Sequence, residues 1–376
     1  MTDLQQCRQE IDKIDNEILR LFEERMKVCA DVAEYKIRTG KQVLDPAREH
    51  EKITTLKGKA HGEFNALGVQ ELFRQIMAIS RKRQYQLLTE NGVESEEDFE
   101  MVDELPRSGV TVVFQGVEGA YSYGAMRAYF EEDIRSYHVK TFRDAMEEVA
   151  CGKADYAVLP IENSTAGIVA DIYDLLTEYS LYIVGEQIIR VEHVLLGLPD
   201  AEESDIRRVF SHPQGLAQCS QFLEEHRNWK KLEVSNTAAA AKKVREEQDK
   251  SQAAIASRDA GEVFGLKVLA ENICRSGHNC TRFIILGKHP VYEKNAGMVS
   301  TCFEAPHESG TLYNMLSHII YNGLNMTRIE SRPIPERTWQ YRFFVDFEGN
   351  LRDSAVKNAL RGIRAEASAL QVLGNY

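Results

Sequence analysis

The stretch LQQCRQEIDKIDNEILRLFEERMKVCADVAEYKIRT, residues 4–39, decides how the first part of this chain folds. Apolar residues recur in it every three or four positions, and neither Pro nor Gly interrupts it before Gly40. Positions a and d of successive heptads hold Leu4, Cys7, Ile11, Ile14, Ile18, Leu21, Val28, Val32 and Tyr35. The pattern predicts one unbroken amphipathic helix with an apolar seam that packs against other helices.

This helix is too long for the module to which it belongs. At about 1.5 Å per residue it spans roughly 54 Å, whereas a segment of about 90 residues folds into a globule only about 30 Å across. We therefore expect a second copy of the chain to cover the overhang. Arg8 and Lys36 both lie beside the seam, yet roughly 42 Å separates them along the axis. They can serve one site only if Arg8 comes from the helix of the other subunit, running antiparallel.

Polar residues interrupt the apolar stripe of each predicted helix in residues 1–90. They are Arg25 in the first helix, Glu49 in a second helix that starts at Asp45-Pro46, and Ser80 and Gln84 in a third helix over 67–88. One such residue is most simply a satisfied core group or an ion pair. Three interrupted stripes in three packed helices indicate a lined cavity. Its cations, carboxylate, hydroxyl and amide suit a small dianion that is held in one conformation rather than attacked.

The order of these residues resembles the AroQ-type chorismate mutase family. The matching positions are Arg8, Arg25, Lys36, Asp45, Glu49, Ser80 and Gln84. The resemblance implies an all-α, intertwined dimer that binds chorismate. It also implies that Arg8 of one subunit and Arg25 of the other hold the two carboxylates of the substrate.

The remaining matches imply how the reaction is promoted. By resemblance, Lys36 and Gln84 hydrogen-bond the ether oxygen whose bond breaks. Glu49 and Asp45 orient the ring hydroxyl and the ammonium of Lys36, and Ser80 makes a lesser contact. Lys36, Glu49 and Gln84 are thus the implied catalytic residues, which act by positioning and by stabilising charge on the ether oxygen.

Bulk properties set limits on the rest of the chain. With 376 residues, two or three domains are expected. The net charge of −12 argues against nucleic acid as a partner. No apolar run approaches a membrane span and the charged N-terminus is unlike a signal peptide, so we expect no membrane partner and a cytoplasmic protein.

The spacing of the cysteines and the position of the acidic residues each predict a property of the chain. The seven Cys are scattered without a CxxC pair, which is typical of reduced thiols in a cytosol. Cys274, His278 and Cys280 lack an evident fourth ligand, so we expect no metal. An acidic run between Glu94 and Glu104 changes the composition sharply and predicts a linker over 91–108.

Strands that each lead into the start of a helix recur in residues 109–288. The strands are 110–114, 156–159, 209–210 and 253–256, and the alternation predicts mainly parallel α/β layers. Ser, Thr and Asn after them are most simply helix N-caps, but they gather where α/β sheets bind ligands. No GxGxxG follows a strand, which disfavours a hydride-transferring Rossmann domain, and no P-loop is present.

Four motifs in this module together resemble prephenate dehydratase. They are residues 118–122 (EGAYS), 159–164 (LPIENS), 211–214 (SHPQ) and 281–283 (TRF), with Val117 where the family usually has Pro. The resemblance implies two periplasmic-binding-protein-like α/β subdomains with prephenate in the cleft between them.

The same resemblance implies roles for individual residues. Thr281 is the implied key hydroxyl, and Arg282 contacts substrate or shapes the same strand. Asn163, Ser164 and Thr165 are expected to bind substrate. Because a neutral alcohol is a poor acid, we add the hypothesis that Glu162, or a water held by it, supplies the proton.

Residues 296–376 predict a βαββαβ order, which is the split ferredoxin-like arrangement. The segments Gly310-Thr311-Leu312-Tyr313 and Glu330-Ser331-Arg332-Pro333 resemble the two signatures of the ACT domain, with Thr311 in place of the usual Ala. The resemblance implies that L-phenylalanine binds near these segments as an allosteric effector. Alternatively, Gly310 and Pro333 simply serve turns and the module only dimerises.

The whole sequence therefore resembles the bifunctional chorismate mutase/prephenate dehydratase family. The implied enzyme rearranges chorismate to prephenate and then decarboxylates and dehydrates it to phenylpyruvate. It needs no cofactor, it is inhibited by L-phenylalanine, and it forms a homodimer or larger homo-oligomer. Two alternatives stay open: a binding protein that only senses a small anion, and a lyase that prefers arogenate.

Overall fold

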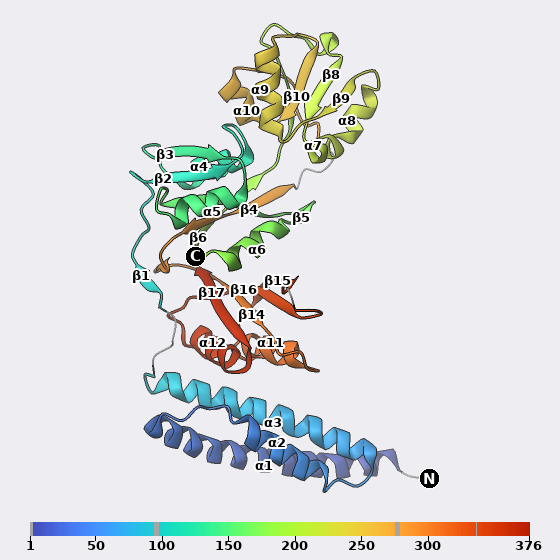
Figure 1. Cartoon of the computed structure of the whole chain (residues 1–376). Helices are drawn as coiled ribbons and strands as arrows, with labels where there is room; N and C mark the ends of the chain where they lie inside the picture. The colour runs from blue at the N-terminus through green and yellow to red at the C-terminus, as the bar shows by residue number, and fades with distance from the viewer. Residues whose placement is uncertain (1–2, 94–97, 275–278, 336) are drawn as a thin grey trace. The chain divides into compact units, whose positions relative to one another are not determined.

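The computed structural model describes residues 3–93, 98–274, 279–335 and 337–376 (Figure 1). The chain divides into two compact units. Unit 1 comprises Met1–Glu97 and Gly297–Val372, and unit 2 comprises Asp98–Ala296 and Leu373–Tyr376. Among the described residues, no helix is both long and apolar enough to cross a membrane.

The N-terminal part of unit 1 consists of three helices (Figure 1). These are α1 (Leu4–Thr39), α2 (Pro46–Lys57) and α3 (Glu63–Glu90), and both α1 and α2 pack against α3. Gly40 ends α1 in the left-handed region at φ 67°, and Asp45 caps α2 by accepting a hydrogen bond from the Arg48 amide. The predictions for α1 and α2 are confirmed. Helix α3 begins four residues earlier than predicted. Its first turn carries no apolar periodicity, so the sequence pattern did not include it.

The apolar seam of α1 is largely exposed in the single chain. Ile14 is 59% exposed and Val28 60% exposed, and Ala33 is the one buried residue described on this helix. An exposed apolar seam of this length is typical of a helix that packs against further helices.

The C-terminal part of unit 1 has the predicted βαββαβ order. Its elements are β14 (Met298–Glu304), α11 (Thr311–Tyr321), β15 (Met326–Pro333), β16 (Tyr341–Glu348), α12 (Ser354–Glu366) and the first part of β17 (Ala369–Asn375), whose last three residues belong to unit 2. The strand order is β15-β16-β14-β17, with β15-β16 and β16-β14 antiparallel. Helices α11 and α12 contact each other and α3. Trp339 lies before β16 and has a φ of 61°.

Unit 2 contains two lobes, each built on one sheet. The first lobe orders its strands β6-β12-β4-β2-β3, with β5 paired to β4, and the second orders them β11-β7-β10-β8-β9. The first-lobe elements are β2 (Thr111–Gln115), α4 (Tyr121–Tyr129), β3 (Arg135–Val139), α5 (Phe142–Ala150), β4 (Tyr156–Asn163), β5 (Gly167–Ile168), α6 (Ala170–Glu178), β6 (Tyr182–Arg190) and β12 (Cys280–Gly287).

The second lobe is the insertion between β6 and β12. It comprises β7 (Val194–Gly197), η1 (Glu203–Asp205), β8 (Arg208–Ser211), α7 (Pro213–Gln218), α8 (Ser220–Glu225), β9 (Lys230–Glu233), α9 (Thr237–Glu247), β10 (Gln252–Ala256), α10 (Arg258–Phe264) and β11 (Lys267–Ala270). Each lobe has its own buried core, around Phe114 and Ile285 in the first and around Leu196 and Ala254 in the second.

Two sequence predictions for unit 2 need correction. The sheets are mixed rather than mainly parallel, because β12 runs antiparallel to both β4 and β6, and β7 antiparallel to both β10 and β11. The chain crosses to the second lobe after β6 and returns in β12, and this return places an antiparallel strand in the middle of the sheet. The predicted linker also contains a strand, β1 (Glu100–Val102), which pairs in parallel with β13 (Val291–Glu293).

Candidate active sites

The helical part of unit 1 encloses a cavity of about 280 Å³. Six of the seven residues predicted for the first site line it: Arg25, Lys36, Asp45, Glu49, Ser80 and Gln84. All three helices contribute residues to its lining, and α1 and α2 each pack against α3. The predicted lined cavity is present among the described residues.

Hydrogen bonds fix the polar edge of this cavity. Nη1 of Arg25 donates to Oγ of Ser80, which in turn donates to the Ile76 carbonyl at 2.7 Å. Nε2 of Gln84 donates to the Ser80 carbonyl at 3.2 Å. Within the described structure, Oε1 of Gln84 is buried without a hydrogen-bond partner. A buried polar atom of this kind is costly unless a ligand or water satisfies it.

Lys36 is the half-buried cation of the cavity. Its Nζ donates to the carbonyl of Val43 at 2.6 Å. Burial lowers the pKa of Lys36 below that of a free lysine, even though the charges of Asp45 and Glu49 act in the opposite direction. The ammonium is therefore easier to deprotonate than usual.

We expect this lowered pKa to limit any reaction that needs the Lys36 ammonium. The rate should be full at lower pH and should fall as the pH rises through the lowered pKa, earlier than a free lysine would allow. The measurement is a pH profile of kcat/KM for turnover at this cavity. Lys36→Arg, which stays protonated, should remove the alkaline fall; an unchanged profile in that variant would assign the fall to another group.

Arg8 lies outside the cavity of its own chain. It is exposed, and at about 1.5 Å per residue it is roughly 26 Å along α1 from Arg25. One chain therefore does not bring all seven predicted residues together.

Sequence reasoning missed several residues that line this cavity, such as Arg48 and Lys52. The most buried cation that it missed is Arg81. Its buried guanidinium places Nη1 at 2.7 and 2.6 Å from the two carboxylate oxygens of Glu49. A signal for it existed, because position 81 is four residues after Met77 and three before Gln84 on the inward face of α3. The sequence prediction named only Ser80 and Gln84 as inward polar residues of this helix.

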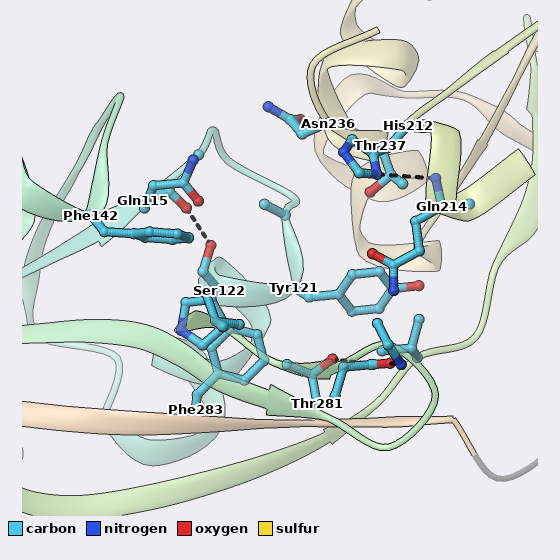
Figure 2. A pocket seen from close by; sticks show the side chains of 18 of the residues that line it. Gln115, Tyr121, Ser122, Phe142, His212, Gln214, Asn236, Thr237, Thr281 and Phe283 are labelled. Carbon is cyan, nitrogen blue, oxygen red and sulfur yellow. Dashed lines mark hydrogen bonds between the residues drawn. The ribbon is translucent and has the colours of Figure 1, made fainter. Parts of the chain in front are cut away.

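A second cavity, of about 580 Å³, lies between the two lobes of unit 2. Figure 2 shows Phe142, Thr281 and Phe283 from the first lobe and His212, Gln214, Asn236 and Thr237 from the second. The N-terminal residues of α4 and α9 both line it. Two helix N-termini favour an anionic ligand, and the two Phe rings provide an apolar surface for a ring.

Thr281 is held in this cavity by Asn163, on the neighbouring strand. Oδ1 of Asn163 accepts from the backbone amides of Thr165 and Ala166 at 3.0 and 2.9 Å. Because backbone amides only donate, this fixes the orientation of the amide group. Its Nδ2 then donates to Oγ1 of Thr281 at 2.9 Å. The Thr281 hydroxyl acts as acceptor there, which leaves its own proton to donate to a ligand.

Asn163→Asp tests this arrangement with almost no change in shape. The aspartate would still accept from the two backbone amides, but an oxygen would replace Nδ2 and take the Thr281 proton. We expect kcat for turnover in this cavity to fall about a hundredfold, which is the usual cost of losing one transition-state donor. Steady-state kinetics measure it, with activity at the unit 1 cavity as a check on folding. An undiminished kcat would show that Asn163 does not direct the hydroxyl.

A chain of hydrogen bonds continues from Asn163 to the second lobe. Thr165 donates to Asn163 at 2.7 Å, and Nε2 of Gln218 lies 3.3 Å from Oγ1 of Thr165. Oε1 of Gln218 is 2.9 Å from Nε2 of His193, whose Nδ1 is 3.0 Å from the Tyr121 hydroxyl. Sequence reasoning missed His193 and Gln218, because neither lies in a motif beside Thr281.

Burial sets the protonation states of His193 and Tyr121 in this series of hydrogen bonds. It lowers the pKa of His193, an effect that the Gln218 hydrogen bond only partly offsets, and it raises the pKa of Tyr121 well above its ordinary value. Both side chains are therefore neutral at pH 7.

Four predicted residues lie outside the lining of the unit 2 cavity: Glu162, Ser164, Thr165 and Arg282. Arg282 pairs with Glu162 in register, one position from the Thr281–Asn163 pair. Since successive strand residues point to opposite faces, these two side chains face away from Thr281. Nε of Arg282 instead donates to Glu186, and Nη2 to the Tyr376 hydroxyl, both at 2.6 Å. The geometry gives no support to substrate binding by Arg282 or to Glu162 as proton source.

The predicted effector residues belong to α11 and β15. Gly310, at φ 84°, precedes α11, Thr311 donates to the Pro306 carbonyl at 2.8 Å, and Tyr313 is exposed. Glu330, Ser331 and Arg332 lie on β15, an edge strand. These residues, with Leu312, lie outside both cavities. Of the metal candidates, His278 lies outside the described residues.

Residues 7–85 match the family model of chorismate mutase type II, and residues 112–291 match that of prephenate dehydratase. A curated relative, the bifunctional chorismate mutase/prephenate dehydratase of Neisseria gonorrhoeae (strain ATCC 700825 / FA 1090), is 33% identical over 370 residues, which cover 98% of this chain and 95% of the relative. This chain belongs to the bifunctional chorismate mutase/prephenate dehydratase family.

Two solved structures similar to this family member each cover 71% of the chain. The prephenate dehydratase of Arthrobacter aurescens in complex with L-Phe is 32% identical with a TM-score of 0.66, over 71% of this chain and 89% of that one. A protein described as a novel type of quorum-quenching acylase is 34% identical with a TM-score of 0.66, over 71% and 97%. One fold thus carries different named activities, and the activity must be argued from the site.

Proposed function

We propose that this chain converts chorismate to prephenate in the unit 1 cavity and prephenate to phenylpyruvate in the unit 2 cavity. The observation that carries the proposal is that each cavity lies in the segment matching the family model for that reaction. The proposal keeps the domain boundaries expected from the sequence, 1–90, 91–108, 109–288 and 296–376, and it requires no cofactor.

The mutase step requires positioning and charge stabilisation. Arg25 takes one substrate carboxylate, and the Lys36 ammonium and the second amide hydrogen of Gln84 stabilise charge that develops on the ether oxygen. Glu49 orients the ring hydroxyl, and Asp45 orients Lys36. The group holds the substrate in the reactive conformer and makes no covalent bond to it.

The dehydratase step removes CO₂ and the ring hydroxyl of prephenate together. The electron pair of the bond between the carboxylate carbon and the ring enters the ring, the ring becomes aromatic, and the hydroxyl leaves as water with one proton taken up from solvent. Thr281 donates a hydrogen bond to that leaving oxygen, and Asn163 holds Thr281 in place. The N-termini of α4 and α9 attract the substrate carboxylates, and the two lobes act as the two subdomains of a periplasmic-binding-protein-like cleft.

A second copy of the chain completes the first site in this proposal. The exposed seam of α1 and the distance of Arg8 from its own cavity support an antiparallel, intertwined homodimer in the cytoplasm. Arg8 of the partner would then take the second carboxylate of chorismate.

Ile14→Asp should break this dimer. It puts a charge into the centre of the seam of both subunits and removes roughly 2 kcal/mol or more of apolar burial per chain. We expect a monomer by analytical ultracentrifugation at concentrations where the unaltered chain is dimeric. Asn16→Asp adds the same charge at an exposed position two residues on and should stay dimeric. If both variants remain dimers, the seam is not the interface.

Feedback inhibition by L-phenylalanine completes the proposal. The βαββαβ order and the likeness to a dehydratase solved with L-Phe support an ACT domain at residues 296–376. Phenylalanine would bind between two such domains near Gly310–Tyr313 and Glu330–Arg332, and would favour a less active arrangement.

Proton NMR of the purified chain given chorismate alone tests the proposed function. Prephenate that appears first and phenylpyruvate that follows would establish both reactions. Prephenate that accumulates would leave the second site inactive or specific for arogenate, which a parallel sample with arogenate separates. Chorismate that is depleted from solution without product would favour a binding protein.

A further inference from the structure

A buried arginine joins the mutase cavity to the C-terminal part of unit 1. The side chain of Arg81 on α3 is 8% exposed. Its Nη1 contacts both carboxylate oxygens of Glu49, and its Nε lies 2.9 Å from Oε1 of Glu366, at the end of α12. One planar guanidinium thus holds a carboxylate of the proposed active site and a carboxylate of the βαββαβ module.

Glu366 is itself fixed from a second helix of that module. Nε2 of His318 on α11 lies 3.0 Å from the same Oε1, and the two side chains are 2% and 9% exposed. Burial raises the pKa of Glu366, but the hydrogen bond from His318 and the charge of Arg81 more than offset this and hold it below its usual value. Glu366 is therefore an ionised anchor for the guanidinium.

The two carboxylates are coupled because they share one rigid cation. The donors of a guanidinium have fixed directions, so a shift of Glu366 turns the plane that Glu49 contacts. In a buried ion pair, the loss of one partner leaves the remaining charge uncompensated, and the group moves to find another. Displacement of a substrate-positioning group by about 1 Å can change a rate about a hundredfold.

We propose that Arg81 is a positioning residue of the mutase reaction and that Glu366 sets its place, so that the βαββαβ module controls the mutase rate through this contact. The proposal rests on the proposed function of the unit 1 cavity. It adds control by the C-terminal module to that function, because none of the seven residues matched to the mutase belongs to this module. The seven effector residues predicted from sequence take no part in the contact.

The chain offers a matched control for this contact. Nζ of Lys82, the next residue of α3, donates to Oγ of Ser317 on α11 at 2.9 Å. This hydrogen bond joins the same helices, but neither residue contacts Glu49 or lines the mutase cavity. Ser317→Ala therefore loosens α3 from the module without touching the guanidinium that holds Glu49.

The experiment is a double-mutant cycle on the full-length chain. It compares the unaltered chain, Glu366→Gln, Arg81→Met, the double variant and Ser317→Ala. Mutase kcat and KM are measured with chorismate, and dehydratase kcat with prephenate in the same preparations. Dehydratase kcat and the thermal transition show that each variant is folded. If Arg81→Met does not fold, Arg81→Lys replaces it, since an ammonium bonds either carboxylate but does not span both as a guanidinium does.

We expect Glu366→Gln to lower mutase kcat about tenfold in the unaltered background and less than about twofold in the Arg81 variant, because coupled residues are non-additive. Ser317→Ala should change neither activity. Equal losses from Glu366→Gln in the two backgrounds, or equal losses from Glu366→Gln and Ser317→Ala, would overturn the proposal and leave a general packing effect. If the unaltered chain converts no chorismate, the proposed function fails before any variant is compared, and the inference falls with it.

Discussion

Thr281→Val should lower dehydratase kcat about 10²- to 10³-fold, the range found when one transition-state hydrogen-bond donor is removed. Valine matches threonine in shape, so the cavity keeps its volume. Asn163 keeps two other acceptors for its Nδ2, the Asn279 side chain at 2.8 Å and the Cys280 carbonyl at 3.2 Å. The fall in kcat would thus come from the missing hydroxyl and not from an Asn163 amide left without a hydrogen-bond acceptor.

The measurement is phenylpyruvate formation from prephenate, with KM determined beside kcat. KM should change little, because the hydroxyl acts on the leaving oxygen more strongly in the transition state than in the ground state. Thr281→Ser retains the hydroxyl and should stay within about tenfold of the unaltered chain, and mutase activity should be unchanged in both variants. A Thr281→Val enzyme with full kcat would remove Thr281 from the mechanism.

Arg8→Ala and Glu49→Ala should each reduce mutase kcat/KM about a hundredfold or more, the usual result when a buried charged contact loses one partner. Mixed and allowed to exchange subunits, the two variants should recover activity. In an isologous dimer, half of the random pairs are mixed and each mixed pair has one intact site of two, so recovery should approach about a quarter.

A second mixture provides the control. Lys36→Ala and Glu49→Ala both damage the part of the site that comes from one chain, so no mixed pair contains an intact site. This mixture should stay inactive. If verified heterodimers of the Arg8 and Glu49 variants are also inactive, the site is not shared between subunits.

Helical periodicity predicted the first cavity well, for a physical reason. Residues on one face of a helix follow from spacing alone, so Arg25, Glu49 and Gln84 could be placed inward without coordinates. Arg81 was on the same face, but its partner Glu366 comes from the far end of the sequence. No local pattern indicates that a buried cation has such a partner.

The sequence predicted the second cavity less well, because successive side chains of a strand point to opposite faces of the sheet. Asn163 was expected to bind substrate and Glu162 to supply a proton in the same site, but Asn163 faces Thr281 whereas Glu162 faces away. The register also shifts between Arg282 and Phe283, which a sequence pattern does not show. His193 and Gln218 reach the cavity from the second lobe, and their contribution depends on how the two lobes meet.

The position of Arg8, outside the cavity of its own chain, has a consequence for assays. If the partner supplies this residue, mutase turnover per chain falls when a sample is diluted below the dissociation constant of the dimer. Dehydratase turnover has no such requirement, since one chain contains the whole cleft. The ratio of the two activities in one cuvette would then report the assembly state without any label, and specific mutase activities measured at nanomolar and micromolar protein would not be comparable.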